Sequence, residues 1–420
     1  MCVELDLSAL RLSDYIRPGD TLCWGQAAAE PLNLTKTLID QRHSIGPIKA
    51  FIGIGFSETP DPALCDTIQF QSYCGTGTNR KLIAANCLDI LPIPYSFFPK
   101  VLAQRVDVLL LQLAPTGTEG EFSFGMACEY LHALVGRARV VIAEVNDQVP
   151  ATRSDWTISA ADIDVLIRSS TPVSEATSPS APTAVDLAIA EHVAALIDDG
   201  ATLQVGLGTL PTAILNALSG HRDLGLHSGM INDSLSRLIE SGVITNARKG
   251  RDEGISIGGM LTGDARTRAF CHNNPAIRLA PTEYTHAIRT LAQLNKFTAI
   301  NSAIEVDLTG QANAEVAAGR YVGAVGGGTD FLRGAAASEG GLPILALPAA
   351  LTTRSGKLIS KIVTKLSGPT SVSRADAGIV VTEYGVADLR GLGLAARVEK
   401  MISIAHPDLR EQLSRDAVPS

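Results

Sequence analysis

Two glycine-rich turns in this sequence could do chemistry through their backbone. The first is the run Gly206-Leu207-Gly208-Thr209-Leu210, which follows a predicted strand and leads through Pro211 into a predicted helix. Proline suits the first turn of a helix, because its missing N–H is not needed there. Free N–H groups at such a helix start can bind a phosphate or stabilise a developing oxyanion. The alternative is an ordinary strand–helix turn, since a dinucleotide fingerprint would have glycine in place of Pro211.

The second glycine-rich turn is the stretch Gly323-Ala324-Val325-Gly326-Gly327-Gly328. Three consecutive glycines are costly in chain entropy. They therefore favour a place where the backbone approaches a ligand or another chain closely, although a flexible hairpin tip would also explain them. The sequence has no G-x-x-x-x-G-K-[ST] motif, which excludes a P-loop nucleotide enzyme.

Carboxylates are the side chains that we expect to carry any chemistry in this sequence. The eight histidines form no H-E-x-x-H pattern, and His227, which follows a predicted strand, is more often a structural residue than a ligand in such a place. No G-x-S-x-G nucleophile elbow is present. Cys128 and Cys271 have no motif around them and are expected in the core. No metal, flavin or nicotinamide signature appears, so none of these cofactors is expected.

The elements that position these groups show an internal repeat. The pattern G-x-T-L-x-x-G occurs at residues 19–25 and 200–206, each time followed by a proline and a predicted helix, at 33–39 and 213–218. Apolar residues at helical spacing predict a further helix over 185–197.

Two more pairs of segments recur in the same order. β-Branched runs that close on a glutamate lie at 138–144 and 378–383, and predicted strands with glycines after them lie at 106–113 and 298–304. Apolar strands that alternate with helices favour an α/β fold with mostly parallel sheets, covered on both faces. Ligands bind such sheets outside the carboxyl ends of the strands, so we expect the site at the glycine turns, in a cleft between the halves.

These signals predict two related open α/β domains in tandem. The expected division is an N-terminal domain over 1–168, a Ser/Thr/Pro-rich linker over 169–182 and a C-terminal domain over 183–420.

Composition narrows the class of protein. The chain has 420 residues, of which 45% are hydrophobic and 19% charged, as in a folded protein. Its apolar stretches are too short or too broken for a membrane helix, and its first residues do not resemble a secretory signal. Seven scattered cysteines without a C-x-x-C pair indicate a reducing cytoplasm. A net charge of −8 with dispersed basic residues argues against nucleic acid as a partner.

Several segments, in order along nearly the whole chain, resemble the acetyl-CoA hydrolase/transferase family. That family includes 4-hydroxybutyrate, butyrate and acetate CoA-transferases and belongs to the wider class I CoA-transferases. The segments lie at residues 106–125, 143–150, 206–211, 223–228, 243–246, 273–275, 300–311, 325–331, 382–391 and 404–408.

The resemblance implies two tandem domains of the CoA-transferase type and a bound coenzyme A thioester. By the same resemblance, residues Gly206, Leu207, Gly208, Thr209 and Leu210 would contact CoA or the thioester oxygen through their backbone. Gly326 and Gly327 would lie along the pantetheine arm, and Lys357 would be a further CoA contact. The resemblance also implies a homodimer or higher homo-oligomer, with an acyl-CoA and a small carboxylate as substrates.

One position departs from the family. Its transferases carry a nucleophilic glutamate in the segment that here reads His227-Ser228-Gly229-Met230, and Gly229 stands at the glutamate position. That glutamate forms a mixed anhydride and then a glutamyl-CoA thioester, and glycine can form neither.

Four interpretations remain open. Another carboxylate could supply the nucleophile, and the candidates are Glu305, Glu30, Glu144 and Glu383, each of which could instead be a cap or an ion-pair partner. Water could enter beside Gly229, activated by a neighbouring carboxylate, and give an acyl-CoA hydrolase that cleaves a thioester or a C–C bond. The protein could bind CoA esters without turnover, or the substitution could have inactivated an ordinary transferase. We expect an acyl-CoA-using enzyme that moves CoA to a small carboxylate, with hydrolysis as the alternative.

Overall fold

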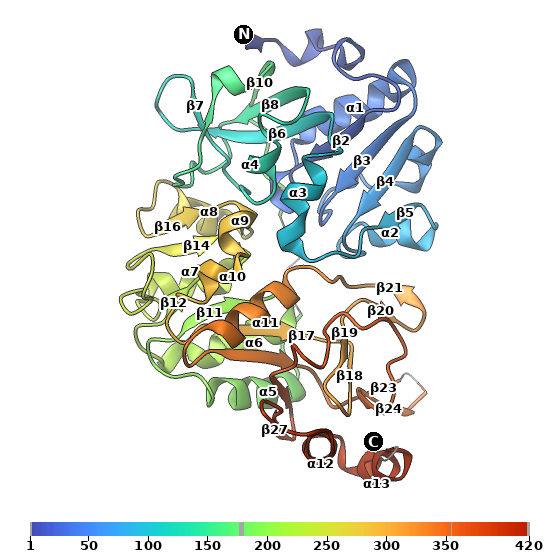
Figure 1. Ribbon diagram of the computed structural model, residues 1–420. Helices are drawn as coiled ribbons and strands as arrows, with labels where there is room; N and C mark the ends of the chain where they lie inside the picture. Colours follow the sequence, from blue (N-terminus) through green and yellow to red (C-terminus); the bar gives the residue numbers. More distant parts are fainter. Residues whose placement is uncertain (1, 176–179, 354, 418–420) are drawn as a thin grey trace. The chain divides into compact units, whose positions relative to one another are not determined.

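The structure is a computed structural model that describes residues 2–175, 180–353 and 355–417 (Figure 1). The chain folds into two compact units, and each unit draws on separate parts of the sequence. Unit 1 comprises Met1–Thr177, Gly229–Ser236 and Ile255–Thr285, and unit 2 comprises Ser178–Ser228, Arg237–Gly254 and His286–Ser420. Segments from the second half of the sequence therefore belong to unit 1. The linear division at residues 168 and 183 remains a prediction about the domains of the family.

Unit 1 is built on one large sheet whose main strands are all parallel. Its strands, in spatial order, are β1 (Val3–Glu4), β10 (Val165–Ser169), β8 (Val140–Asn146), β6 (Val108–Pro115), β2 (Thr21–Trp24), β3 (Ile48–Ile52), β4 (Ile68–Ser72) and β5 (Leu88–Ile90). Antiparallel strands β7 (Glu121–Ser123) and β9 (Ile158–Ser159) extend from β6. The central strand β6 is buried from Val108 to Ala114, as its continuous apolar run predicts.

Apart from α1, the remaining helices and strands of unit 1 are short. Its helices are α1 (Leu32–Ile45), α2 (Arg80–Ala84), α3 (Phe98–Leu102), α4 (Leu131–Leu134), α8 (Ala265–Cys271) and α9 (Thr282–Thr285). Two small parallel ladders pair β13 (Met230–Ile231) with β15 (Met260–Leu261), and β14 (Ser256–Gly258) with β16 (Ile277–Leu279). Helix α7 (Asp233–Glu240) begins in unit 1 and ends in unit 2.

Unit 2 contains a second sheet, which is parallel except at its last pair. Its order is β12 (Gly225–Leu226), β11 (Thr202–Val205), β17 (Thr298–Ser302), β22 (Leu342–Ala346), β26 (Ile379–Thr382) and β27 (Gly385–Asp388). Smaller ladders contain β18 (Glu305–Asp307), β19 (Ala312–Asn313), β20 (Val316–Ala317), β21 (Arg320–Tyr321), β23 (Ala350–Thr352), β24 (Leu358–Ser360) and β25 (Ile362–Val363).

Unit 2 also contains helices, some of which pack on its sheet. They are α5 (Ala184–Ala194), α6 (Thr209–Ala217), α10 (Ile288–Leu291), α11 (Gly328–Ala337), α12 (Leu394–Ser403) and α13 (Pro407–Asp416). Helix α11 contacts β17 and β22, while α5 contacts β26 and β27. The mixed α/β class with mostly parallel sheets, expected from the sequence, is confirmed in both units.

The predicted helices are confirmed with shifted ends. Residues 33–39 lie inside α1, 213–217 lie inside α6, and the helix expected over 185–197 is α5, which ends earlier. Helix α5 begins with a capping box between Thr183 and Asp186, because each side chain bonds the other residue's backbone N–H. Of the expected linker, residues 176–179 lie outside the described residues, and Ser169 is the last residue of β10.

Of the three pairs of recurring segments found in the sequence, two occupy equivalent places in the two sheets. Strands β2 and β6 are adjacent and parallel in unit 1, as β11 and β17 are in unit 2. The third pair, residues 138–144 and 378–383, forms strands that hold different positions in the two sheets. Strand β8 pairs directly with β6, whereas β26 is separated from β17 by β22. That likeness reflects two buried parallel strands of similar composition rather than equivalent positions.

Candidate active site

The segment with glycine at the family's nucleophile position lies at the start of strand β13. The carbonyl oxygen of Gly229 accepts hydrogen bonds from the N–H groups of Gly259 (3.2 Å) and Met260 (3.1 Å). Gly229 is half-buried, whereas the next residues, Met230 and Ile231, are buried in the β13–β15 ladder. The backbone at Gly229 is therefore held firmly while the Cα keeps some access to its surroundings.

A buried carboxylate, Glu129, lies beside this segment in unit 1. A Cβ added to Gly259 would lie 2.9 Å from the Gly229 carbonyl oxygen and 3.3 Å from Cγ of Glu129. The backbone next to Glu129 is fixed on both sides, because the Cys128 N–H donates to the Gly259 carbonyl (3.0 Å) and the Thr282 N–H donates to the Glu129 carbonyl (3.1 Å). Glycine at 259 lets the Glu129 side chain lie directly over the backbone that carries Gly229.

Neutral polar groups hold the Glu129 carboxylate. The side-chain amide of Gln26 donates to both carboxylate oxygens, at 2.9 and 2.8 Å, and the hydroxyl of Tyr95 donates to Oε1 at 2.8 Å. The amide of Gln26 is itself oriented, because its oxygen accepts from the Tyr73 hydroxyl (2.8 Å) and from the N–H of Ile54 (3.0 Å). These partners of the Glu129 carboxylate are uncharged.

The surroundings of Glu129 change its acid–base behaviour. Burial raises the pKa of Glu129 to about 7, and the hydrogen bonds from Gln26 and Tyr95 oppose that rise. Aromatic rings line this region, with the Tyr95 ring 5.2 Å from that of Phe98 and 5.3 Å from that of Tyr73. A carboxyl with this pKa is present in both protonation states near neutral pH, as a general acid or base requires.

Glu144, a candidate from the sequence, lies within strand β8 and is fully buried. Its Oε2 accepts from the Asn33 N–H (3.0 Å) and the Leu34 N–H (3.4 Å), and its Oε1 accepts from the Asn33 side chain (2.7 Å) and the Ser169 hydroxyl (2.7 Å). The carboxylate therefore bonds the first turn of α1, where free N–H groups and the helix dipole favour negative charge.

Glu30 lies close to Glu144 in unit 1. Its carboxylate accepts hydrogen bonds from the hydroxyls of Thr35 (2.9 Å) and Ser57 (2.7 Å). Burial raises the pKa of Glu30, hydrogen bonds from Thr59, Ser57 and Thr35 oppose this, and the charge of Glu144 adds to the rise. The structure thus brings these two candidates together around the start of α1.

Glu305 and Glu383 belong to unit 2. Oε1 of Glu305 accepts from the N–H (2.6 Å) and hydroxyl (2.8 Å) of Ser367 and from the side-chain amide of Asn313 (3.0 Å). Burial alone would raise the pKa of Glu305, but these hydrogen bonds hold the pKa below its ordinary value. Glu383 follows strand β26, is half-buried, and accepts from the Ala349 N–H (2.8 Å).

The expected CoA-binding turn at residues 206–210 connects β11 to α6 in unit 2. Gly208 precedes the first residue of the helix with φ of 126°, a conformation that side chains rarely adopt, so glycine is required there. Pro211 lies in the first turn of α6, as the sequence predicts. Leu207 is 48% exposed, which leaves an apolar side chain at the tip of this turn.

The second glycine run leads into helix α11. A Cβ at Gly327 would lie 2.6 Å from Nε2 of His286, and one at Gly323 would lie 2.0 Å from the Ala314 carbonyl oxygen. Gly326 has φ of 53°. Close approach to neighbours within unit 2 thus accounts for glycine at 323 and 327. Burial lowers the pKa of His286 to about 3, so this imidazole is neutral at physiological pH.

Lys357 lies in the turn between β23 and β24 and is exposed. Its N–H donates to the Thr353 hydroxyl at 3.1 Å, and its carbonyl accepts from the Thr353 N–H at 2.9 Å. The backbone of Lys357 is therefore fixed against Thr353.

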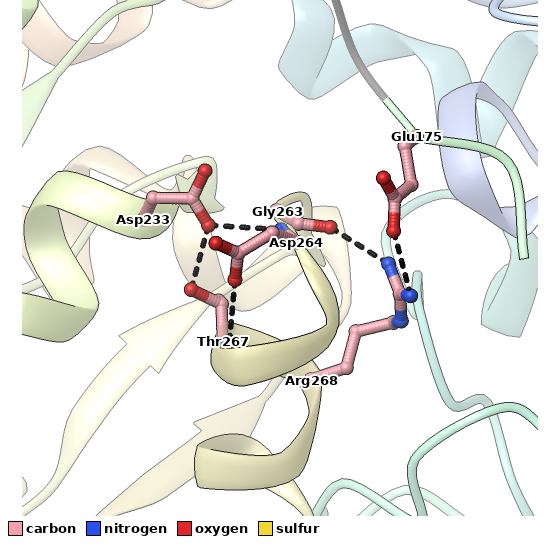
Figure 2. Close-up of polar contacts among 6 residues, drawn as sticks. All are labelled: Glu175, Asp233, Gly263, Asp264, Thr267 and Arg268. Atoms are coloured by element: carbon pink, nitrogen blue, oxygen red, sulfur yellow. Dashed lines mark hydrogen bonds and ion pairs between the residues drawn. The ribbon is translucent and has the colours of Figure 1, made fainter. Parts of the chain in front are cut away.

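Polar contacts tie the later segments of unit 1 to its N-terminal part (Figure 2). Oδ1 of Asp233 accepts from the Asp264 N–H (3.0 Å) and the Thr267 hydroxyl (2.6 Å), which joins the segment after Gly229 to helix α8. Arg268 donates to the Gly263 carbonyl (2.9 Å) and pairs with Glu175 (2.8 Å). The contacts of Asp233 and Arg268 thus fix the segment that follows strand β13.

Sequence reasoning missed Glu129 together with Gln26 and Tyr95. These residues lie far apart in the chain and belong to no motif. One signal could have found Glu129: it is the acidic residue within the mostly apolar run 122–135. An unpaired charge in such a run must be satisfied by partners from elsewhere or be functional. Cys128 and Cys271 are buried with free thiols, so their expected place in the core is confirmed.

Two structural findings bear on partners. Within residues 2–175, 180–353 and 355–417, no helix is both long enough and apolar enough to cross a membrane. The same residues include no cluster of His, Cys, Asp or Glu side chains that could hold a metal ion.

Comparison with known proteins identifies the family. Residues 7–175 match the acetyl-CoA hydrolase/transferase N-terminal domain, and residues 263–417 match the C-terminal domain of the same name. The 4-hydroxybutyrate coenzyme A transferase of Clostridium kluyveri is 34% identical over 400 residues, which cover 94% of this chain and 92% of that protein. The butyryl-CoA:acetate CoA-transferase of Anaerostipes caccae is 32% identical and covers 96% and 93% of the two chains. RipA from Yersinia pestis superimposes with a TM-score of 0.90 at 31% identity, over 96% and 94% of the chains. The chain therefore belongs to the acetyl-CoA hydrolase/transferase family.

Proposed function

We propose that this chain is an enzyme that binds an acyl-CoA and hydrolyses its thioester bond. The observation that carries the proposal is Gly229. At the position of the family's nucleophilic glutamate there is no side chain to form a covalent intermediate, and this glycine is only half-buried. Water is the nucleophile that remains when that carboxylate is absent, provided that a base activates it.

CoA transfer to a small carboxylate is the second candidate. The relatives that align over more than nine-tenths of this chain are CoA-transferases by name. Transfer would require another carboxylate to take the part of the missing glutamate, and Glu305, Glu144, Glu383 and Glu30 are the candidates from the sequence. Each of these already accepts hydrogen bonds from neighbouring backbone or hydroxyl groups. These contacts support a structural role for each of the four carboxylates.

One incubation separates these functions. The wild-type protein is mixed with acetyl-, butyryl- or succinyl-CoA and an excess of a different carboxylate, and both free thiol and new acyl-CoA are measured. We expect free CoA to accumulate whether or not the second carboxylate is present. A new acyl-CoA formed at enzymatic rates would favour transfer instead. Tight CoA-ester binding with neither product would indicate a binding protein.

We further infer how the substrate is held and where the enzyme acts. Backbone N–H groups at residues 206–210, Gly326 and Gly327, with Lys357, are proposed to bind the CoA moiety, since a helix start suits anionic groups. We also propose a cytoplasmic homodimer or higher oligomer, with two domains divided at 168 and 183. Seven free thiols support a reducing compartment. Light scattering of the purified protein tests the oligomeric state.

A further inference from the structure

We propose that Glu129 is the catalytic carboxylate of this chain and acts as the general base for the water that attacks the thioester. The inference rests on the proposed function and deepens it, because it says which group replaces the family's glutamate. Glu129 is 3% exposed and lies in unit 1 together with Gly229.

The position of Glu129 is the first argument. The Gly229 carbonyl oxygen and Cγ of Glu129 both lie within van der Waals distance of one point, the position of a Cβ on Gly259. The N–H of Gly259 in turn bonds the Gly229 carbonyl at 3.2 Å. The side chain of Glu129, which comes from another segment, thus passes through its Cγ beside the backbone that bonds Gly229.

The orientation of the carboxylate is the second argument. Oε1 accepts from both Gln26 and Tyr95, whereas Oε2 accepts a hydrogen bond of 2.8 Å from Gln26. A carboxylate oxygen has two lone pairs, so Oε2 retains the capacity to bind a water and take its proton. Gln26 is locked by Tyr73 and Ile54, so the carboxylate is oriented before any substrate arrives.

The backbone of Glu129 is the third argument. Its φ is 37°, in the left-handed region that favours glycine, and long side chains are uncommon there. Such strain persists where surrounding contacts over-determine it, and it concentrates at functional sites. Here the contacts are the hydrogen bonds made by the Cys128 and Thr282 N–H groups. A packing role alone would not require a carboxylate at a position with a strained backbone.

The reaction balances with water as the sole co-substrate. Ionised Glu129 takes a proton from water, the water oxygen bonds to the thioester carbonyl carbon, and the carbonyl electron pair moves onto its oxygen. When this oxyanion collapses, the C–S bond breaks and sulfur leaves with the bonding pair. The proton on Glu129 then passes to the thiolate. Acyl-CoA and water thus give a carboxylic acid and free CoA, and Glu129 is ionised again.

The acid–base properties of the neighbourhood agree with this role. The pKa of Glu129 is raised to about 7 by burial, so the ionised base forms as pH rises through neutrality. The titratable groups that interact with it are Tyr73, Tyr95, Tyr130 and Cys128, and burial raises the pKa of each well above the ordinary value. Glu283, whose charge acts on Cys128, also has a raised pKa because of burial. The four phenol and thiol groups stay neutral at pH 7.

The first test compares Glu129→Gln with Glu283→Gln, the same change at a glutamate of helix α9 in the same unit. For whichever acyl-CoA the wild type hydrolyses, we expect kcat of Glu129→Gln to fall by about 100-fold or more, the range of general base catalysis. Glu283→Gln should keep the wild-type rate. A folded Glu129→Gln variant with wild-type kcat overturns the proposal.

Tyr95→Phe keeps the test decisive if Glu129→Gln does not fold. It removes the hydroxyl that donates to Oε1 and stabilises the ionised carboxylate. We expect the wild-type rate to rise with pH through about 7. In Tyr95→Phe this rise should move to higher pH by about one unit, since a lost hydrogen bond to a charged group corresponds to roughly that shift. An unmoved pH profile would show that Glu129 is structural.

A labelling experiment separates the base from a nucleophile. A single turnover in ¹⁸O-water should put the label in the carboxylic acid product and leave the peptide that contains Glu129 unlabelled. Label in that peptide would overturn the general-base role. If the wild type forms no free CoA from acetyl-, butyryl- or succinyl-CoA, the proposed hydrolase function itself fails. If it hydrolyses them while the Glu129 and Tyr95 variants behave as wild type, the function stands and this inference fails.

Discussion

At the scale of single residues, a carboxylate is missing from one position and another lies beside it. Gly229 cannot form the covalent intermediates of its family, and Glu129 reaches the backbone next to it across Gly259. Glu129 is surrounded by neutral donors, so its charge is stabilised less than that of Glu305, which bonds two backbone N–H groups. The two glutamates illustrate how partners decide whether a buried carboxylate is a structural anion or a titrating base.

Restoring the family residue tests this account. In Gly229→Glu the new carboxylate should attack an acyl-CoA, and we expect a covalent CoA adduct on the protein together with acyl exchange into added acetate. Intact-mass measurement after incubation with acetyl-CoA checks the adduct, and Gly229→Ala is the matched control without a carboxylate. A folded Gly229→Glu variant that never carries CoA would mean that position 229 does not correspond to the nucleophile.

At the scale of elements, Glu144 joins strand β8 to helix α1. Its carboxylate bonds the N–H groups of Asn33 and Leu34 in the first turn of the helix and also accepts from Ser169 in β10. One side chain thereby satisfies donors that the helix leaves free and links two neighbouring strands to it. The position of this carboxylate is explained by the start of α1.

Removal of the Glu144 charge should therefore affect stability. We expect Glu144→Gln to lower the free energy of unfolding by about 2 kcal/mol, the scale of buried hydrogen bonds to a charged group. Urea denaturation of the full chain measures the change, and Asp40→Asn, an exposed acidic residue on the same helix, is the control. An unchanged midpoint with loss of turnover would instead place Glu144 in the chemistry.

At the scale of the whole molecule, the units are interleaved in sequence. Gly229–Ser236 and Ile255–Thr285 fold with the N-terminal part, and Asp233 and Arg268 fasten them there (Figure 2). Residues of the proposed site, Glu129 and Gly229, thus come from distant parts of one chain. Unit 1 is complete only when the later segments are present.

A truncated chain tests this interleaving. A protein of residues 1–177 lacks the segments that pair with Cys128 and Glu129 through backbone hydrogen bonds. We expect it to lose the fixed aromatic environment around Tyr95, because buried donors and apolar surface are left uncovered. Near-ultraviolet circular dichroism and limited proteolysis, compared with the full chain, check this. A fragment with native spectra and resistance would show that the linear division at residue 168 is sufficient for folding.

Local sequence patterns alone determined several strands, helices and turns of this protein. The apolar run of β6, the helical spacing of α5 and the glycine–proline turn before α6 act over a few residues, so they could be predicted from sequence. Family membership followed from segments spread along the chain. The similar composition of residues 138–144 and 378–383 wrongly predicted equivalent positions for the two strands. Such composition indicates that a strand is buried, but it does not determine where the strand lies in its sheet.

Only the tertiary structure decided which carboxylate lies beside Gly229. Glu129 and Gly229 are a hundred residues apart, and they meet because Gly259 allows two backbones and a side chain to approach closely. Such a meeting depends on long-range register and on burial, which also sets the pKa of Glu129. Neighbouring residues in the sequence determine neither the long-range register nor the burial, because both arise when distant segments pack together and exclude water.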